Sequence, residues 1–186
     1  MILRPVSRRA AVKAGAAAAA GLVLGRSLPA RAQGTQNLPL ITRPIPSTGE
    51  RLPVIGLGTN AYSANTAEQM APLREVLERM PQIGGKLIDT ARVYGRSEAV
   101  IGELVEGIGN RKDLFLATKT PMFGDFSNPE AVFDVSFKAL RTDRIDLMQI
   151  HMMAGLTALM PVFEKAKAGG RIRYIGMTTS HGRRHD

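Results

Sequence analysis

The fold is decided by the stretch Leu87-Ile88-Asp89-Thr90-Ala91-Arg92-Val93-Tyr94-Gly95-Arg96-Ser97-Glu98, residues 87–98. It leads from a short apolar run, through the carboxylate of Asp89, into a loop with Tyr94 and then into a helical pattern. Two later apolar runs end in a similar way, one before Lys119 and the next before His151. The carboxyl ends of parallel strands meet at one mouth of a barrel, where the chemistry of such enzymes is found. These positions therefore predict a functional site.

The spacing of apolar residues extends this pattern along the chain. Five short runs have the length of buried strands: residues 54–57, 87–88, 114–117, 145–150 and 172–177. Helical patterns lie between them, at residues 66–80, 97–108, 128–140 and 156–168. This alternation implies right-handed crossovers between parallel strands. Two architectures remain open at this point, an open doubly wound sheet and a (β/α)8 barrel.

Individual residues predict where these helices begin. We expect Pro72 to delay the regular part of the first helix, because proline removes a backbone donor. We expect Ser97 to cap the start of the second helix. Asn128 followed by Pro129 is typical of a helix start, with a cap and then proline in the first turn.

Each candidate site residue also has a simpler interpretation. Asp89 could cap a turn, and Lys119 could be a solvated loop lysine. His151 could be a core histidine bonded to a backbone carbonyl, and Tyr94 could line a wall with its hydroxyl in water. Their recurrence at the ends of successive strands favours the functional interpretation.

The same residues resemble a known family. Residues 87–98 resemble the Asp-Thr-Ala-x-x-Tyr-Gly-x-Ser-Glu segment of the aldo-keto reductases, and Ala117-Thr118-Lys119 resembles their third-strand lysine. Gln149-Ile150-His151 is similar to their fourth-strand histidine, and Ile55-Gly56-Leu57-Gly58-Thr59 to their first-strand Gly-x-Gly-Thr. Residues 172–176 match their fifth strand. The resemblance covers about residues 52–180 and implies an α/β fold of the (β/α)8 TIM-barrel type, incomplete, with about five strands and four helices.

The resemblance also implies a reaction, the NADPH-dependent reduction of an aldehyde or ketone to an alcohol. The catalytic tetrad of the family falls on Asp89, Tyr94, Lys119 and His151. Tyr94 would protonate the alkoxide, and the Lys119 ammonium would favour the tyrosinate and so make the hydroxyl a better acid. Asp89 would hold Lys119 by a charge-assisted hydrogen bond, and His151 would orient the carbonyl oxygen. The substrate and the preference between NADPH and NADH stay open.

The implied cofactor is NADP(H), although Gly56-x-Gly58 is not a dinucleotide fingerprint. The contacts that we expect with it are Gly58, Thr59, Asn60, Asp89, Thr178 and Thr179. The last two stand where the family usually has Ser-Asn. The family's remaining three strands would supply the nicotinamide stacking residue and the phosphate-binding loops. We therefore expect the isolated chain to be poorly stable and to bind NADPH weakly, with self-association through the open barrel edge as a further expectation.

The first 32 residues carry most of the excess charge. The chain has 25 Lys and Arg against 16 Asp and Glu, a formal charge of +9, and residues 1–32 contain basic side chains but no acidic one. Ser7-Arg8-Arg9-Ala10-Ala11-Val12-Lys13 before an apolar run resembles a twin-arginine export signal, with cleavage expected before Gln33. This predicts a periplasmic or otherwise exported bacterial protein that meets the membrane only in transit. Residues 33–51 are interpreted as a linker and residues 52–186 as the barrel part, whose near balance of charge argues against a nucleic-acid partner.

Other functions remain as alternatives. One is a non-catalytic half-barrel that acts as a pairing module. Another is a metal-dependent lyase or isomerase that uses His151 and Asp89. His181 and His185 are four residues apart, but no acidic residue joins them at a convincing spacing, so no metal site is expected. The absence of cysteine excludes disulfides and thiolate chemistry.

Overall fold

The computed structural model describes residues 39–180, and at its centre lies a sheet of five parallel strands. The strands are β3 (Leu57–Gly58), β4 (Leu87–Asp89), β5 (Phe115–Lys119), β6 (Ile145–Ile150) and β7 (Ile172–Met177). They neighbour one another in strict sequence order, β3-β4-β5-β6-β7. A doubly wound sheet would instead reverse its strand order at a switch point. The order therefore selects the barrel type of the two architectures that the sequence left open.

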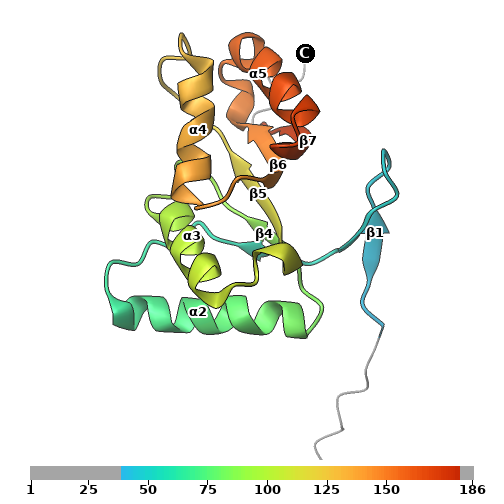
Figure 1. The fold of residues 1–186 in the computed structure, drawn as a ribbon, viewed down its shortest axis with the longest axis vertical. Helices are drawn as coiled ribbons and strands as arrows, with labels where there is room; N and C mark the ends of the chain where they lie inside the picture. Colours follow the sequence, from blue (N-terminus) through green and yellow to red (C-terminus); the bar gives the residue numbers. More distant parts are fainter. Residues whose placement is uncertain (1–38, 181–186) are drawn as a thin grey trace, which may run out of the picture. The chain divides into compact units, whose positions relative to one another are not determined.

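Each pair of successive strands is connected by a helix. The helices are α2 (Ala67–Gln82), α3 (Ser97–Ile108), α4 (Pro129–Ala139) and α5 (Leu156–Ala168). Short 3-10 turns precede β5 and follow β6, η1 (Arg111–Asp113) and η2 (His151–Met153). Figure 1 shows α3 and α4 on the same side of the strands, as expected for the outer layer of a barrel.

The core lies between the strands and this helical layer. Ile88, Met148 and Ile150 of the strands are fully buried, and so are Phe133 of α4 and Phe163 of α5. The rings of Phe133 and Phe163 meet edge to face with centroids 5.5 Å apart, a favourable aromatic geometry. Side chains alternate between the two faces of a strand. Ile88, Met148 and Ile150 point outward from the strands toward the helices. The alternate side chains, which include Asp89 and Lys119, therefore lie on the inner face of the sheet.

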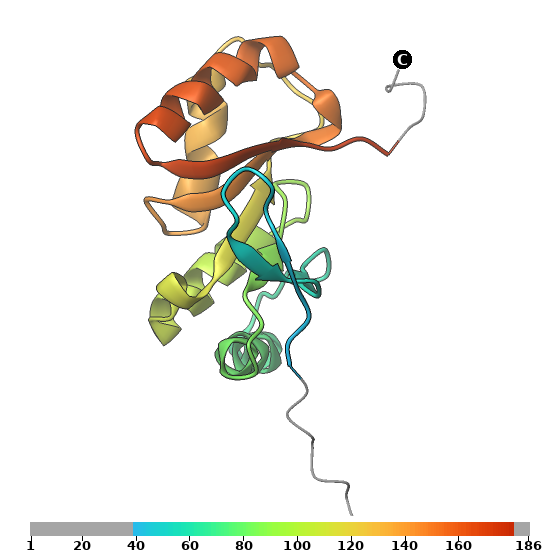
Figure 2. The same cartoon turned by 90° about the vertical axis from the view of Figure 1, so that its right-hand side faces the viewer.

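A two-stranded hairpin precedes the parallel sheet, in the segment interpreted above as a linker. Its strands are β1 (Thr42–Pro44) and β2 (Arg51–Pro53), which pair antiparallel. Glu50, at the base of β2, accepts hydrogen bonds from Tyr174 and Arg173 of β7. Figure 2 shows the hairpin crossing in front of the parallel strands, on the side away from α3 and α4. The linker interpretation is therefore wrong for residues 42–51, which form most of this paired hairpin and contact a distant strand through Glu50.

Three local predictions are also wrong. The first parallel strand pairs only Leu57 and Gly58 with β4, while Ile55 is 78% exposed. Pro72 lies inside α2, which begins at Ala67, because one lost backbone hydrogen bond is offset by packing of the apolar face. Ser97 is the first residue of α3 and not its cap, since its hydroxyl donates to the Thr59 carbonyl oxygen at 2.7 Å. The cap at Asn128 is confirmed by its side chain, which accepts from the Ala131 amide.

Some expectations fall outside the described residues, namely the export signal at 1–32 and the pair His181 and His185. Within residues 39–180, no helix is long and apolar enough to cross a membrane. The same range contains no group of three or more His, Asp or Glu side chains arranged to hold a metal ion.

Candidate active site

The site is built from the carboxyl ends of three adjacent parallel strands. Asp89 is the last residue of β4, Lys119 is the last residue of β5, and His151 directly follows β6. Lys119 lies in register with Gln149 of β6, so the two residues share the inner face. The structure thus brings to one mouth the strand-end residues that the sequence singled out.

Lys119 and Asp89 form the centre of the site. The Lys119 ammonium donates to both carboxylate oxygens of Asp89, at 2.8 and 2.7 Å, and to the Thr90 carbonyl oxygen at 2.9 Å. Lys119 is buried, whereas the Asp89 side chain is 40% exposed. A buried ammonium is tolerated only with a full set of acceptors. The three acceptors therefore hold the Lys119 ammonium in a fixed position.

Tyr94 lies beside this ammonium, in the loop between β4 and α3. The Lys119 Nζ atom is 5.2 Å from the centroid of the Tyr94 ring, within the range of a cation–π contact. The loop is tightly bonded: the Tyr94 amide donates to the Ala91 carbonyl at 3.0 Å, and the Tyr94 carbonyl accepts from the Ser97 amide at 3.1 Å. Tyr94 is half-buried.

His151 enters the site from β6. Its backbone amide donates to the Thr120 hydroxyl at 3.1 Å, and its Nδ1 atom is buried with no hydrogen-bond partner among the described residues. Burial lowers the pKa of His151, and the nearby Lys119 charge lowers it further, against the opposing effect of Asp89. The imidazole is therefore neutral at neutral pH. A neutral imidazole carries one N–H donor, which a carbonyl oxygen can accept.

The turn that follows His151 is strained. Met152 and Met153 both have positive φ angles, 54° and 56°, which L side chains rarely adopt. The Met152 amide donates to the Thr178 hydroxyl at 3.1 Å, which ties the turn to the end of β7. Strain of this kind persists only where surrounding contacts impose it. Thr178, an expected cofactor contact, thus has a structural role in holding the segment that carries His151.

The other expected cofactor contacts lie at the end of β3. Thr59 is buried, and its hydroxyl donates to the Asp89 carbonyl oxygen at 2.9 Å, so this side chain fixes the strand that carries Asp89. Gly58 and Asn60 are exposed, and a Cβ atom added at Gly58 would meet no atom within 4 Å. Gly58 lies in register with Asp89 of β4, so its open backbone is next to the partly exposed Asp89 carboxylate. Thr179 is partly buried just beyond the opposite edge strand, β7.

Sequence reasoning missed several residues that support the site. They are side chains with short hydroxyl or carboxyl groups next to the strand ends: Ser63, Ser97, Glu98, Thr118 and Thr120. The Thr118 hydroxyl donates to Glu98 at 2.6 Å in a buried contact between β5 and α3. The position of Thr120, directly after Lys119, was a usable signal. Ser63 had none, because its partners are more than thirty residues away.

Fold and site together define the class of the protein. It is an α/β protein of the (β/α)8-barrel type, whose mouth holds a lysine–aspartate ion pair, a tyrosine and a neutral histidine. The sequence pattern of the aldo/keto reductase family matches residues 54–184. The chain belongs to the aldo/keto reductase family.

Known reductases with similar sequences agree with this assignment. The chain is 30% identical to norsolorinic acid reductase stcV of Emericella nidulans over 158 residues, 72% of this chain and 41% of that protein. It is 31% identical to aldo-keto reductase yakc of Schizosaccharomyces pombe, whose name specifies NADP(+), over 69% of this chain and 43% of that protein. The chain thus spans less than half of the length of these relatives.

Solved structures show the same likeness. An aldo/keto reductase from Brucella melitensis has a TM-score of 0.62 at 29% identity, over 77% of this chain and 56% of that one. An aldo/keto reductase from Klebsiella pneumoniae, in complex with NADP and acetate, has a TM-score of 0.59 at 26% identity, over 73% of this chain and 48% of that one. The described fold therefore matches about half of a family barrel.

Proposed function

We propose that this protein takes part in the NADPH-dependent reduction of an aldehyde or ketone to an alcohol. The observation that carries the proposal is the buried Lys119 ammonium, held by Asp89 and placed against the Tyr94 ring. A charged lysine in that position favours the tyrosinate that remains after Tyr94 has given up its proton. This assists a proton donor at the mouth, as reduction of a carbonyl requires.

Each side chain of the site has a separate role in this reaction. When bound, NADPH supplies a hydride to the carbonyl carbon. The neutral His151 donates a hydrogen bond to the carbonyl oxygen, which becomes negative as the C=O bond opens. The Tyr94 hydroxyl gives its proton to that oxygen and completes the alcohol. Lys119 stabilises the resulting tyrosinate, and Asp89 keeps Lys119 in place.

The residues proposed to hold the cofactor are Gly58, Thr59, Asn60, Asp89, Thr178 and Thr179. They lie at the ends of β3, β4 and β7 and would contact its nicotinamide end. We propose that the 186-residue chain binds NADPH weakly, because no described residue is assigned to its phosphates. Fluorescence titration of NADPH into the purified chain measures this affinity, and micromolar binding would overturn the proposal of weak affinity.

Turnover is tested with the 186-residue chain, NADPH and a panel of aldehydes and ketones. NADPH consumption is followed by absorbance and alcohol formation by chromatography. We expect Tyr94→Phe to lower turnover by about 10²- to 10⁴-fold, the usual contribution of a general acid. Tyr174→Phe is the matched control, because Tyr174 contacts Glu50 and Thr48 far from the mouth. Unchanged turnover in Tyr94→Phe would exclude Tyr94 as the proton donor.

The exported location is a second part of the proposal. Arg8 and Arg9 precede an apolar run, as in twin-arginine signals. Fusion of residues 1–40 to a reporter that is exported only by the twin-arginine route tests this. Replacement of Arg8 and Arg9 by lysine is expected to abolish export, whereas Arg4→Lys, the control, is expected to retain it. Export of the double variant at the wild-type level would contradict the assignment.

Self-association through the open barrel edges is the remaining part. Val54 and Ile55, next to β3, and Met177, at the end of β7, are exposed apolar side chains at the two edge strands. Unpaired strand edges with apolar side chains favour pairing with another chain. Light scattering of the purified chain over a concentration series measures this, and a strictly monomeric mass would refute it.

A further inference from the structure

The loop after β3 holds the segment that carries Tyr94, through a single side chain. The Ser63 hydroxyl donates to the Tyr94 carbonyl oxygen at 3.0 Å and accepts from the Arg96 amide at 2.9 Å. It therefore bonds to the backbone on both sides of Gly95. One hydroxyl thus fixes two consecutive peptide units next to the phenol.

Gly95 makes this contact possible. Its φ angle is +61°, and a Cβ atom at this position would lie 2.6 Å from the Ser63 Oγ atom. Both the backbone conformation and the space taken by Ser63 therefore require glycine here. The approach of Ser63 to the backbone is a specific fit and not an incidental surface contact.

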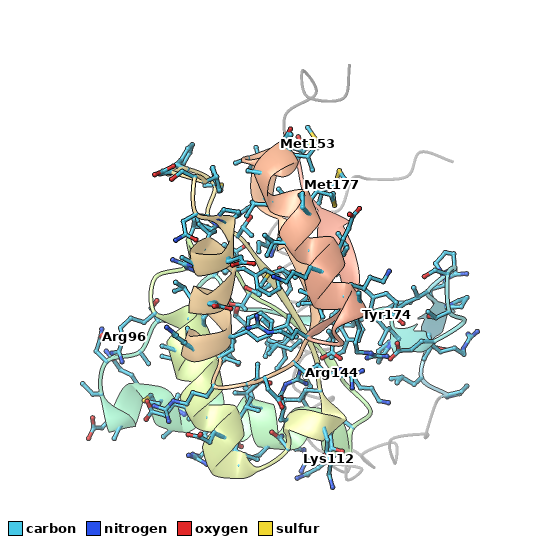
Figure 3. All side chains as sticks on the ribbon, turned by 45° about the horizontal axis from the view of Figure 1, so that its top comes forward. Arg96, Lys112, Arg144, Met153, Tyr174 and Met177 are labelled. Carbon is cyan, nitrogen blue, oxygen red and sulfur yellow. The ribbon has the colours of Figure 1, made fainter. Side chains whose placement is uncertain are left out.

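A second set of bonds fixes the loop that carries Ser63. The Arg96 guanidinium donates to the Ala64 carbonyl oxygen at 2.9 Å and to the Asn65 side-chain oxygen at 2.8 Å. Figure 3 shows Arg96 near the end of α2 that this loop enters. The Arg96 side chain thus bonds to the loop that carries Ser63, while the Ser63 hydroxyl bonds to the backbone of Tyr94 and Arg96.

We propose that Ser63 is a positioning residue that sets the direction of the Tyr94 phenol at the mouth, a role that rests on the proposed reductase function. The Tyr94 carbonyl accepts from Ser63 and from the Ser97 amide, so the loop is anchored on one side to α3 and on the other to the loop after β3. Loss of the Ser63 hydroxyl frees the Tyr94–Arg96 peptides on the β3 side only. The phenol then samples orientations away from Lys119, while the fold remains.

The test uses the 186-residue chain labelled with ¹³C at the ζ carbon of tyrosine. The chain has three tyrosines, and Tyr94→Phe assigns the signal of Tyr94. In Ser63→Ala we expect the Tyr94 signal to shift. We also expect the Arg96 amide to exchange about fivefold faster, as for loss of one ordinary hydrogen bond. Ser63→Thr keeps the hydroxyl and is expected to restore both values.

Ser127→Ala is the matched control, because Ser127 is also exposed and its hydroxyl bonds only to Asp125 among the described contacts. We expect it to leave the Tyr94 signal unchanged. Asn65→Ala removes one hydrogen bond between Arg96 and the loop that carries Ser63. It is expected to speed Arg96 amide exchange by a smaller factor than Ser63→Ala does. This variant decides the matter if Ser63→Ala does not fold.

Turnover separates this inference from the proposed function. With an active chain, Ser63→Ala is expected to lower kcat about tenfold, with a much smaller change in the KM of the carbonyl substrate. Absence of turnover in the wild-type chain would count against the proposed function, whereas the Tyr94 signal would still report on Ser63. A wild-type Tyr94 signal and a wild-type Arg96 exchange rate in Ser63→Ala would overturn the positioning role.

Discussion

The Lys119 ammonium lies within hydrogen-bond distance of both carboxylate oxygens of Asp89, although these residues are thirty positions apart and on neighbouring strands. The two members of the pair are not equally accessible. Lys119 is buried, whereas Asp89 is well exposed to solvent. Asp89 therefore connects a buried charge to the open mouth, and its removal should affect both the chemistry and the stability of the protein.

The first prediction concerns Asp89→Asn. The amide keeps the size of the side chain but removes the charge that holds the Lys119 ammonium beside Tyr94. We expect turnover of a carbonyl substrate to fall at least about tenfold and the urea midpoint of unfolding to fall as well, since the buried Lys119 ammonium loses its charged acceptor. Asp113→Asn, in η1 at the other end of β5, is the control. Turnover within twofold of wild type would show that the ion pair is dispensable.

The second prediction concerns the charge of His151. Its pKa is lowered from 6.5, chiefly by burial and then by the Lys119 charge. A depressed folded pKa contributes stability that is present above the unfolded pKa and is lost as the pH falls through the folded pKa. The stability of wild type relative to His151→Gln should therefore decline as the pH is lowered below about 6.5.

Two measurements check this behaviour. Urea unfolding of both proteins between neutral and mildly acidic pH gives the stability difference. An NMR titration of the imidazole signal, assigned with His151→Gln, gives the folded pKa directly. A midpoint at or above 6.5, or a pH-independent stability difference, would contradict the buried neutral imidazole.

The elements that sequence predicted best are those governed by local periodicity. The strands at 145–150 and 172–177 and the helices at 97–108 and 156–168 have the expected bounds. Asp89 and Lys119 were also predictable as neighbours, because adjacent parallel strands bring their carboxyl ends together. Local apolar patterns and a single topological rule therefore account for the core of the fold and the centre of the site.

What escaped prediction depends on contacts between distant residues. The hairpin at 42–53 is held by Glu50, whose partner Arg173 lies 123 positions later. Ser63 bonds to backbone atoms of Tyr94 and Arg96. Every residue has these backbone atoms, so the residue types in the sequence do not indicate the contact. Both contacts are polar, and neither has a periodic signature along the chain.

The third prediction concerns Glu98, a buried carboxylate at the start of α3. Burial raises its pKa from 4.5, against the lowering effects of hydrogen bonds from Thr118 and Ser136 and of the Arg92 charge. A raised folded pKa contributes stability that is fully present below the unfolded pKa and is lost as the pH rises through the folded pKa. The stability of wild type relative to Glu98→Gln should therefore fall as the pH rises above about 4.5.

Glutamine is the suitable substitution, because its side-chain oxygen can still accept from Thr118. Urea unfolding of the two proteins across the acidic to neutral range gives the difference at each pH. Glu103→Gln, on the exposed side of α3, is the control and is expected to show a much smaller change with pH. A difference that grows in favour of wild type with rising pH would refute the raised pKa.

The last prediction concerns Asp146, at the opposite end of the strands from the candidate active site. Its buried carboxylate accepts from Arg111, from Arg173 and from the Leu116 amide, at 2.9, 2.8 and 2.8 Å. Asp146→Asn leaves two partly buried guanidinium groups without this charge, so we expect it to lower the free energy of unfolding by about 3 kcal/mol. Asp134→Asn, the control, breaks an exposed pair with Arg171 and should cost less than about 1 kcal/mol. Urea denaturation compares the two variants, and equal losses would show that the cluster around Asp146 contributes no more than a surface pair.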